Sequence, residues 1–154
     1  MWNDFSSYII GHYAQAHKIV EVGIGRFPRV ALDLKEHLNL NIVMTDIKPS
    51  DKRIIQDDIC HPHLKIYNGA ELIYSIRPPE ELHPCLVKVA EHVGSDLIIK
   101  ILATDTINST RNFKLINYGR AVFYKLIWKN ASCEDVVSYM NWVFVGYIIT
   151  KDSD

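Results

Sequence analysis

The chain has 154 residues, of which 48% are hydrophobic and 23% charged, so it is long enough for one domain with a sizeable buried core. Its 17 Lys and Arg residues nearly balance its 18 Asp and Glu residues. This balance provides no overall charge to attract nucleic acid or an anionic membrane, although it is compatible with a local basic patch.

The first part of the chain predicts a helix and then a strand–turn–helix–strand unit. Residues 18–22 (Lys-Ile-Val-Glu-Val) and 41–45 (Asn-Ile-Val-Met-Thr) indicate two strands. Apolar residues at helical spacing precede the first strand, at Trp2, Phe5, Ile9 and Tyr13. A second helical stripe separates the strands, at Phe27, Ala31, Leu34 and Leu38, with Pro28 in its first turn. Together these segments form a βαβ unit.

The second part continues the alternation of strands and helices. Strands are expected at 53–56, 71–75 and 96–102, and the six residues 47–52 are too few for a full helix. The intervening helix has the stripe Leu82, Leu86, Val89 and Val93, with Pro84 in its first turn and Gly94 as its C-cap. Residues 113–118 and 121–128 indicate a hairpin around 117–120.

This order predicts an α/β fold that is Rossmann-like and doubly wound. We expect a mainly parallel sheet with helices on both faces and a C-terminal antiparallel hairpin, forming a single domain over residues 1–154. The tail at 130–154 fits a buried strand, a helix or a docking surface, and the pattern does not decide among them.

The cysteines and the N-terminus indicate a cytoplasmic protein. Cys60, Cys85 and Cys133 form an odd set without a C-x-x-C pair, which argues against a disulfide framework and suits a reducing compartment. The start, Met-Trp-Asn-Asp, has no basic leader or apolar run, so no secretory signal is expected. The longest apolar-rich stretch, 136–149, is shorter than the roughly 20 residues of a membrane helix, so no membrane association is expected.

The main candidate site is the turn after the first strand, where Gly23 and Gly25 follow Val22. Open α/β sheets bind ligands where a parallel strand meets the next helix. Glycine allows a tight turn and a close ligand, and the helix N-terminus presents free N–H groups. The alternative is a sharp strand-to-helix turn with nothing bound.

Asp46 and Glu21 indicate which ligand this turn would bind. Asp46 lies 21 residues after Gly25, at the usual position of the acid that accepts ribose hydroxyls, although it could instead cap the turn at 45–49. The third glycine of a dinucleotide fingerprint is replaced by Pro28, which disfavours a pyrophosphate. The carboxylate of Glu21 could meet a cationic group of S-adenosylmethionine, or it could cap a loop or pair with a Lys or Arg.

These residues carry two resemblances. Glu-Val-Gly-Ile-Gly at 21–25, followed by Asp46, resembles the first two cofactor motifs of class I S-adenosylmethionine-dependent methyltransferases, over about residues 18–102. A closer resemblance covers residue 1 to about 128. It is a resemblance to an uncharacterised protein family of methanogenic archaea. Four segments carry it: Met-Trp-Asn-Asp at the start and residues 45–50, 73–79 and 115–120. That likeness implies a Rossmann-like methyltransferase fold without an established activity.

The chain departs from the methyltransferase pattern at two places. Asp57 and Asp58 are the candidates for the acid that meets adenine, but they follow Asp46 by only 11 and 12 residues. They could equally be a solvated residue and a cap, or a pair for a divalent cation. Arg77 replaces the Asn or Asp that amino-methyltransferases often place before Pro-Pro. Its guanidinium could hold an anionic substrate, or it could pair with Asp57, Asp58 or Glu80.

Two sets of motifs bear on other chemistries. The N and S donors of two loops could bind zinc if the loops met, but their spacing is not a standard one: Cys60, His61, His63, His83 and Cys85. His83 and Cys85 are more simply the start of a helix. Neither a G-x-S-x-G elbow nor a phosphate-binding G-x-x-x-x-G-K-[ST] loop is found, which argues against nucleophilic catalysis and phosphoryl transfer. No metal site and no catalytic residue are assigned.

The sequence therefore predicts an S-adenosylmethionine-binding, methyltransferase-like protein whose methyl acceptor is unidentified. The first alternative is a non-catalytic Rossmann-fold module for a nucleotide or a partner, since this fold hosts many functions. An NAD-linked oxidoreductase is a weaker alternative, because Pro28 and Glu21 disfavour it.

Overall fold

The computed structural model describes residues 2–128, so the predictions made for the tail at 130–154 lie outside it. Its regular elements are, in chain order, α1 (Trp2–His12), β1 (Lys18–Val22), α2 (Arg29–His37), β2 (Asn41–Asp46), β3 (Ile54–Gln56), β4 (Leu72–Ile76), α3 (His83–Val93), β5 (Asp96–Lys100), β6 (Phe113–Tyr118) and β7 (Ala121–Leu126). Short 3-10 turns occur at Leu64–Ile66 and Glu80–Leu82. None of the helices in this part of the chain has the length and apolar character to cross a bilayer.

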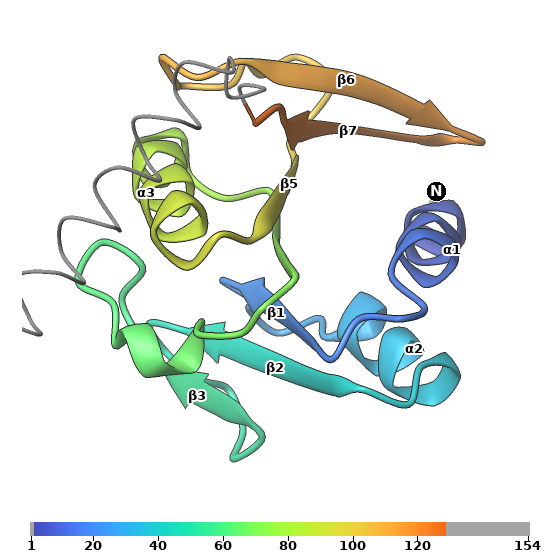
Figure 1. The fold of residues 1–154 in the computed structure, drawn as a ribbon, viewed down its shortest axis with the longest axis vertical. Helices are drawn as coiled ribbons and strands as arrows, with labels where there is room; N and C mark the ends of the chain where they lie inside the picture. The colour runs from blue at the N-terminus through green and yellow to red at the C-terminus, as the bar shows by residue number, and fades with distance from the viewer. Residues whose placement is uncertain (1, 129–154) are drawn as a thin grey trace, which may run out of the picture.

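The strands form one sheet in the order β3-β2-β1-β4-β5-β7-β6 (Figure 1). The pairs from β3 to β5 are parallel, whereas β7 pairs antiparallel with both β5 and β6. The strand β1 is central, since its Val20 lies opposite Val43 of β2 and Ile73 of β4. The order reverses direction between β1 and β4, and ligands of open α/β sheets bind beside such a reversal.

Helices cover both faces of this sheet (Figure 1). Alternate residues of β1 face opposite sides, so Ile19 packs with α1 and α2, while Val20 packs with α3 and the loop after β3. Both residues are fully buried. The predicted doubly wound fold, with a mainly parallel sheet and a C-terminal hairpin, is confirmed.

The start of α2 differs from the prediction. Helical spacing predicts that Phe27 belongs to the apolar stripe of this helix, but Phe27 is 87% exposed, and the helix begins only at Arg29 after Pro28 as N-cap. The chain needs residues 23–28 to turn from the sheet edge to the helix, so Phe27 lies in the turn. The spacing of apolar residues alone does not show at which residue the helix begins.

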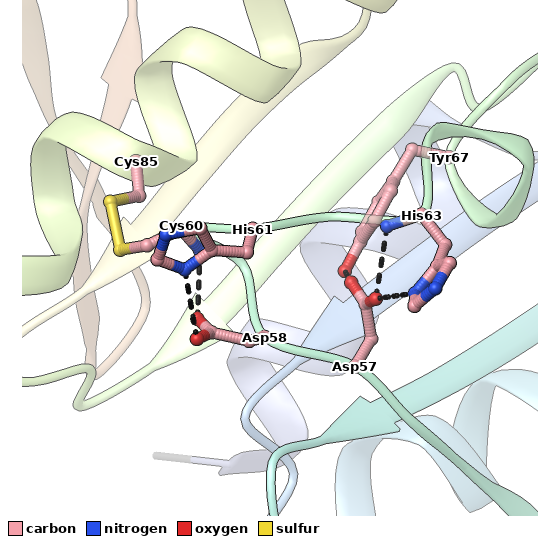
Figure 2. A network of polar contacts seen from close by, with 7 residues as sticks. All are labelled: Asp57, Asp58, Cys60, His61, His63, Tyr67 and Cys85. Carbon is pink, nitrogen blue, oxygen red and sulfur yellow. Dashed lines mark hydrogen bonds and ion pairs between the residues drawn. A yellow bond between two sulfur atoms is a disulfide. The ribbon is translucent and has the colours of Figure 1, made fainter.

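A disulfide joins Cys60, after β3, to Cys85 in the first turn of α3, with their Cα atoms 5.0 Å apart (Figure 2). The expectation that the cysteines form no disulfide is therefore wrong. The two residues are 25 positions apart, and only the packing of the loop against α3 brings them together. The odd cysteine count could not show this pairing.

Reducing this bond should destabilise the protein. A cross-link that closes a loop of this length contributes about 3 kcal/mol, because it restricts the unfolded chain. We expect Cys60→Ser with Cys85→Ser to lower the free energy of unfolding by about that amount in urea titrations. The control is Cys133→Ser, and equal stability of the two variants under oxidising conditions would contradict the prediction.

Candidate functional site

The turn after β1 is shaped by two glycines with left-handed backbone angles, φ 71° at Gly23 and φ 62° at Gly25. Residues with a side chain rarely adopt these angles, which explains the glycines. The N–H groups of Gly23 and Ile24 donate to the carbonyl of Thr45, at 2.9 and 3.1 Å. The turn is thereby fixed to the end of β2.

A hollow of about 480 Å³ lies beside this turn and is called the glycine-turn cavity below. Its lining includes Glu21, Gly23 and Gly25 on one side, with Trp2 of α1 and Arg77 after β4 on the other. It therefore lies at the carboxyl ends of β1 and β4, where the strand order reverses. This is the place that the fold prepares for a ligand.

Glu21 is a buried carboxyl group in the lining of this cavity, with 2% of its surface exposed. The hydroxyl of Tyr74 donates to its Oε2 at 2.5 Å, from the position directly opposite on β4. Burial raises the pKa of Glu21 to about 8, although the Tyr74 hydrogen bond acts in the opposite direction. The side chain therefore favours its protonated, neutral form at neutral pH.

The sequence suggested a Lys or Arg, or a loop, as the alternative partner of Glu21. Tyr74 takes that role instead, and burial together with the nearby Glu21 raises its own pKa well above the ordinary value. Sequence reasoning missed Tyr74. The parallel register of β1 and β4 would have placed it beside Glu21.

Asp46 holds the glycine turn in place. Its Oδ2 accepts the N–H of Gly25 and its Oδ1 accepts the N–H of Lys48, both at 2.8 Å. Ser50 adds a hydrogen bond from its hydroxyl to the carbonyl of Gly25, at 3.2 Å. Asp46 borders the turn without lining the cavity, and its bond to Lys48 matches the turn-capping alternative.

Asp57 is occupied within the loop that follows β3 (Figure 2). Its side chain is fully buried, and its Oδ2 accepts the hydroxyl of Tyr67 at 2.6 Å. Its Oδ1 accepts the backbone N–H of His63 at 3.0 Å and lies 2.8 Å from the ring Nδ1 of that residue. Both oxygens are therefore engaged by the protein itself.

Asp58 also has its partners within this loop (Figure 2). Its Oδ1 accepts the backbone N–H of Cys60 at 2.9 Å, and its Oδ2 lies 3.3 Å from Nδ1 of His61. The Cys60 N–H, followed by His61, lowers the pKa of Asp58. Neither acid of this pair borders the glycine-turn cavity.

The residues considered for zinc do not form a common site. The sulfurs of Cys60 and Cys85 are bonded to each other, while the rings of His61 and His63 contact the neighbouring aspartates. His83 lies at the start of α3, as expected. Within residues 2–128, potential metal ligands do cluster at the surface of α2: Asp33, Glu36 and His37.

Arg77 directly follows β4 and has a left-handed backbone angle, φ 52°, which is rare for a residue with a side chain. Its N–H donates to the carbonyl of Lys100 at 2.7 Å, which holds this conformation. Its guanidinium carbon lies 5.3 Å from the ring centre of Trp2. The expected alternative, an ion pair with Asp57, Asp58 or Glu80, is not present among the described residues.

Two solved structures align with this chain over most of its length. An S-adenosyl-L-methionine methyl transferase from Silicibacter pomeroyi aligns with a TM-score of 0.55 and 14% identity, over 81% of this chain and 89% of that one. A mutant of MtNAS in complex with S-adenosylmethionine aligns with a TM-score of 0.57 and 9% identity, over 82% of this chain and 61% of that one. The chain therefore has the Rossmann-like methyltransferase fold; likeness at such low identity shows the fold alone.

Residues 2–128 match the uncharacterised protein family UPF0146, and the chain belongs to that family. A member from Methanothermobacter thermautotrophicus is 50% identical over 127 residues, covering 82% of this chain and 96% of the relative. One from Archaeoglobus fulgidus is 40% identical over 129 residues, covering 81% and 94%. The resemblance to a family found in methanogenic archaea is confirmed.

Glu21 should make stability fall as the pH rises. Its pKa in the folded protein is about 8 against an ordinary 4.5, so the folded state retains a proton that the unfolded chain loses between these values. The contribution of Glu21 to the free energy of unfolding is fully present below about pH 4.5. Between pH 4.5 and pH 8 it decreases by up to about 1.4 kcal/mol per pH unit. Glu21→Gln stays neutral, so its urea-unfolding free energy should depend less on pH.

The matched control for this comparison is Glu36→Gln, which changes an exposed carboxyl group on α2 in the same way. The measurement is the difference in unfolding free energy between each variant and the wild type, from pH 5 to pH 8. Parallel profiles for Glu21→Gln and the wild type would contradict the assignment of the proton to Glu21.

Asp46→Ala should destabilise the protein, because two backbone N–H groups lose their acceptor. We expect a loss of about 1–2 kcal/mol in urea unfolding. Asp46→Asn keeps one oxygen acceptor and should lose less. Unchanged stability of Asp46→Ala would show that these bonds do not hold the glycine turn.

Proposed function

We propose that the protein binds S-adenosylmethionine in the glycine-turn cavity and transfers its methyl group to a second substrate. The observation that carries this proposal is the buried carboxyl of Glu21 in the cavity lining, next to Gly23 and Gly25. A carboxyl group held neutral by burial ionises when a cation binds beside it. The ammonium of S-adenosylmethionine is such a cation.

The shape and charge of the cavity support this ligand. A volume of about 480 Å³ falls within the range of small-molecule sites, about 300–1,000 Å³. Arg26 and Arg29 line the cavity as well, and they provide cations for the carboxylate of the same ligand. The protein thus offers opposite charges to the two charged groups of the methionine end.

In this proposal the aspartates act around the cofactor. Each oxygen of Asp46 accepts one N–H, and a carboxylate oxygen has two lone pairs, so the group can still accept ribose hydroxyls. Asp57 and Asp58 hold the loop after β3, with partners inside that loop. The adenine would then be bound mainly by contacts other than these two acids.

The bound cofactor supplies an activated methyl group: the carbon–sulfur bond breaks as the new bond to the acceptor forms, leaving a neutral thioether. The chain's own residues would hold the two reactants in line and exclude water. The acceptor's proton passes to solvent or to a neighbouring group. The lack of an obvious general base near Arg77 is compatible with this chemistry, because alignment contributes most of the rate.

A second candidate is a non-catalytic module that binds a nucleotide-like ligand or a partner. It is favoured by the aspartates, since Asp46, Asp57 and Asp58 all have hydrogen-bond partners within the protein. Release of S-adenosylhomocysteine from methyl-labelled S-adenosylmethionine, together with a labelled product, distinguishes the enzyme from the module.

The cofactor assignment predicts that S-adenosylmethionine and S-adenosylhomocysteine bind to the full chain in calorimetry. Glu21→Gln should weaken both by about 10- to 100-fold, because a hydrogen bond to a charged group contributes about 1.5–3 kcal/mol. Binding at pH 7 should release a proton from Glu21, so the measured enthalpy should vary with the ionisation enthalpy of the buffer.

Glu36→Gln is again the control, since it lies outside the cavity lining. Failure of the wild type to bind either compound at millimolar concentration would overturn the proposal. Saturable binding of NADH instead, followed by its fluorescence, would favour the oxidoreductase alternative.

A further inference from the structure

A second hollow, of about 450 Å³, lies at the carboxyl ends of β4 and β5 and against β7. Three cationic residues contribute to its lining, Arg77, Lys100 and Arg120, and the acidic residue among the lining is Asp105. We call it the cationic cavity. Arg77 belongs to the linings of both this cavity and the glycine-turn cavity, so the two hollows are neighbours.

Lys100 is a buried cation that forms no ion pair with a carboxylate of the part of the chain that the structure describes. Only 5% of its surface is exposed, and its Nζ donates to the carbonyl of Val122 at 3.0 Å. The ring centres of Trp2 and Phe5 lie 5.6 and 5.9 Å from this nitrogen. Burial, and then the charge of Arg77, lowers the pKa of Lys100. A buried ammonium normally requires a counter-charge, and residues 2–128 place no carboxylate in contact with it.

Arg77 and Lys100 lie close to the same aromatic ring. The guanidinium carbon of Arg77 is 5.3 Å, and the ammonium of Lys100 5.6 Å, from the centre of the Trp2 ring. Two like charges in one place repel each other, so their proximity costs free energy in the absence of an anion. The left-handed backbone of Arg77 adds to that cost.

Arg120 comes from the turn between β6 and β7, which α1 fixes in position. Asp4 of α1 accepts the backbone N–H of Arg120 at 2.8 Å, and a side chain at Gly119 would clash with Asp4. Among residues 2–128, no carboxylate oxygen lies within 4.0 Å of the charged nitrogens of Arg77, Lys100 or Arg120. With one acid against three bases, the lining is net positive.

We propose that the cationic cavity binds an oxyanion, the carboxylate or phosphate group of a small molecule, between Arg77, Lys100 and Arg120. All three residues contribute to the lining of this hollow, and guanidinium and ammonium groups form charge-assisted hydrogen bonds with such oxygens. An anion there relieves the repulsion between the cations. Because the glycine-turn cavity adjoins through Arg77, this oxyanion belongs to the methyl acceptor, an assignment that rests on the proposed function.

The test is calorimetric titration of the full chain with inorganic phosphate and with succinate, at constant ionic strength maintained with chloride. We expect at least one of them to bind, and the stronger one identifies whether phosphate or carboxylate is the preferred group. Lys100→Met and Arg120→Gln should each weaken that binding by about tenfold or more, as expected for loss of one charge-assisted hydrogen bond.

The matched control is Lys88→Met, which removes the same charge from the exposed face of α3. Thermal melting reports whether Lys100→Met folds, and Arg120→Gln changes an exposed side chain, so one variant tests the site even if the other is unstable. The proposal is overturned if neither anion binds, or if Lys88→Met weakens binding as much as both site variants do.

Titrating the anion with and without S-adenosylmethionine separates this inference from the proposed function. If the anion binds and S-adenosylmethionine does not, the oxyanion site is supported and the methyltransferase proposal is contradicted. Simultaneous binding of both supports the acceptor assignment. Competition between them overturns that assignment, because the anion then occupies the place of the cofactor's own carboxylate.

Discussion

The organisation of this protein depends on the pairing of β1 with a parallel strand on each side. Because β2 and β4 flank β1, the chain must turn away from the sheet at the carboxyl end of β1. Gly23 and Gly25 supply the backbone angles for that turn. The same pairing buries Glu21 beside Tyr74, where only 2% of the residue's surface is exposed and a charge is poorly solvated. The glycine-turn cavity and the buried carboxyl group of Glu21 thus both result from the position of β1 between β2 and β4.

The acidic and basic residues of the protein are nearly equal in number, but they are unevenly distributed around its two cavities. The lining of the glycine-turn cavity includes a buried acid whose pKa is raised to about 8, whereas the lining of the cationic cavity includes a buried lysine with no carboxylate partner among residues 2–128. Arg77 contributes to the lining of both hollows, and its strained backbone is held by the hydrogen bond from its N–H to the carbonyl of Lys100. Overall composition could not show such local asymmetry, because it averages over the surface.

The loop between β3 and β4 is held by contacts among its own residues. Asp57 is bound by Tyr67 and His63, and the disulfide from Cys60 fixes the loop to α3 (Figure 2). These contacts hold together a connection that contains a short 3-10 turn, Leu64–Ile66, where a strand–helix–strand crossover would have an α-helix. Acids that a methyltransferase would direct to adenine here stabilise the loop, so recognition of a nucleotide would depend on the glycine turn and Asp46.

The sequence by itself determined the order of strands and helices, the doubly wound sheet and the glycine turn, because periodicity, glycine and proline act locally. The sequence also places a charged residue, Lys100, in an otherwise apolar run, which by itself indicates an unusual buried charge. Only the tertiary structure decided that Cys60 meets Cys85, that Tyr74 holds Glu21, and that Lys100 joins cations from other segments. These contacts join residues far apart along the chain, and their formation depends on strand register and packing, which no local pattern specifies.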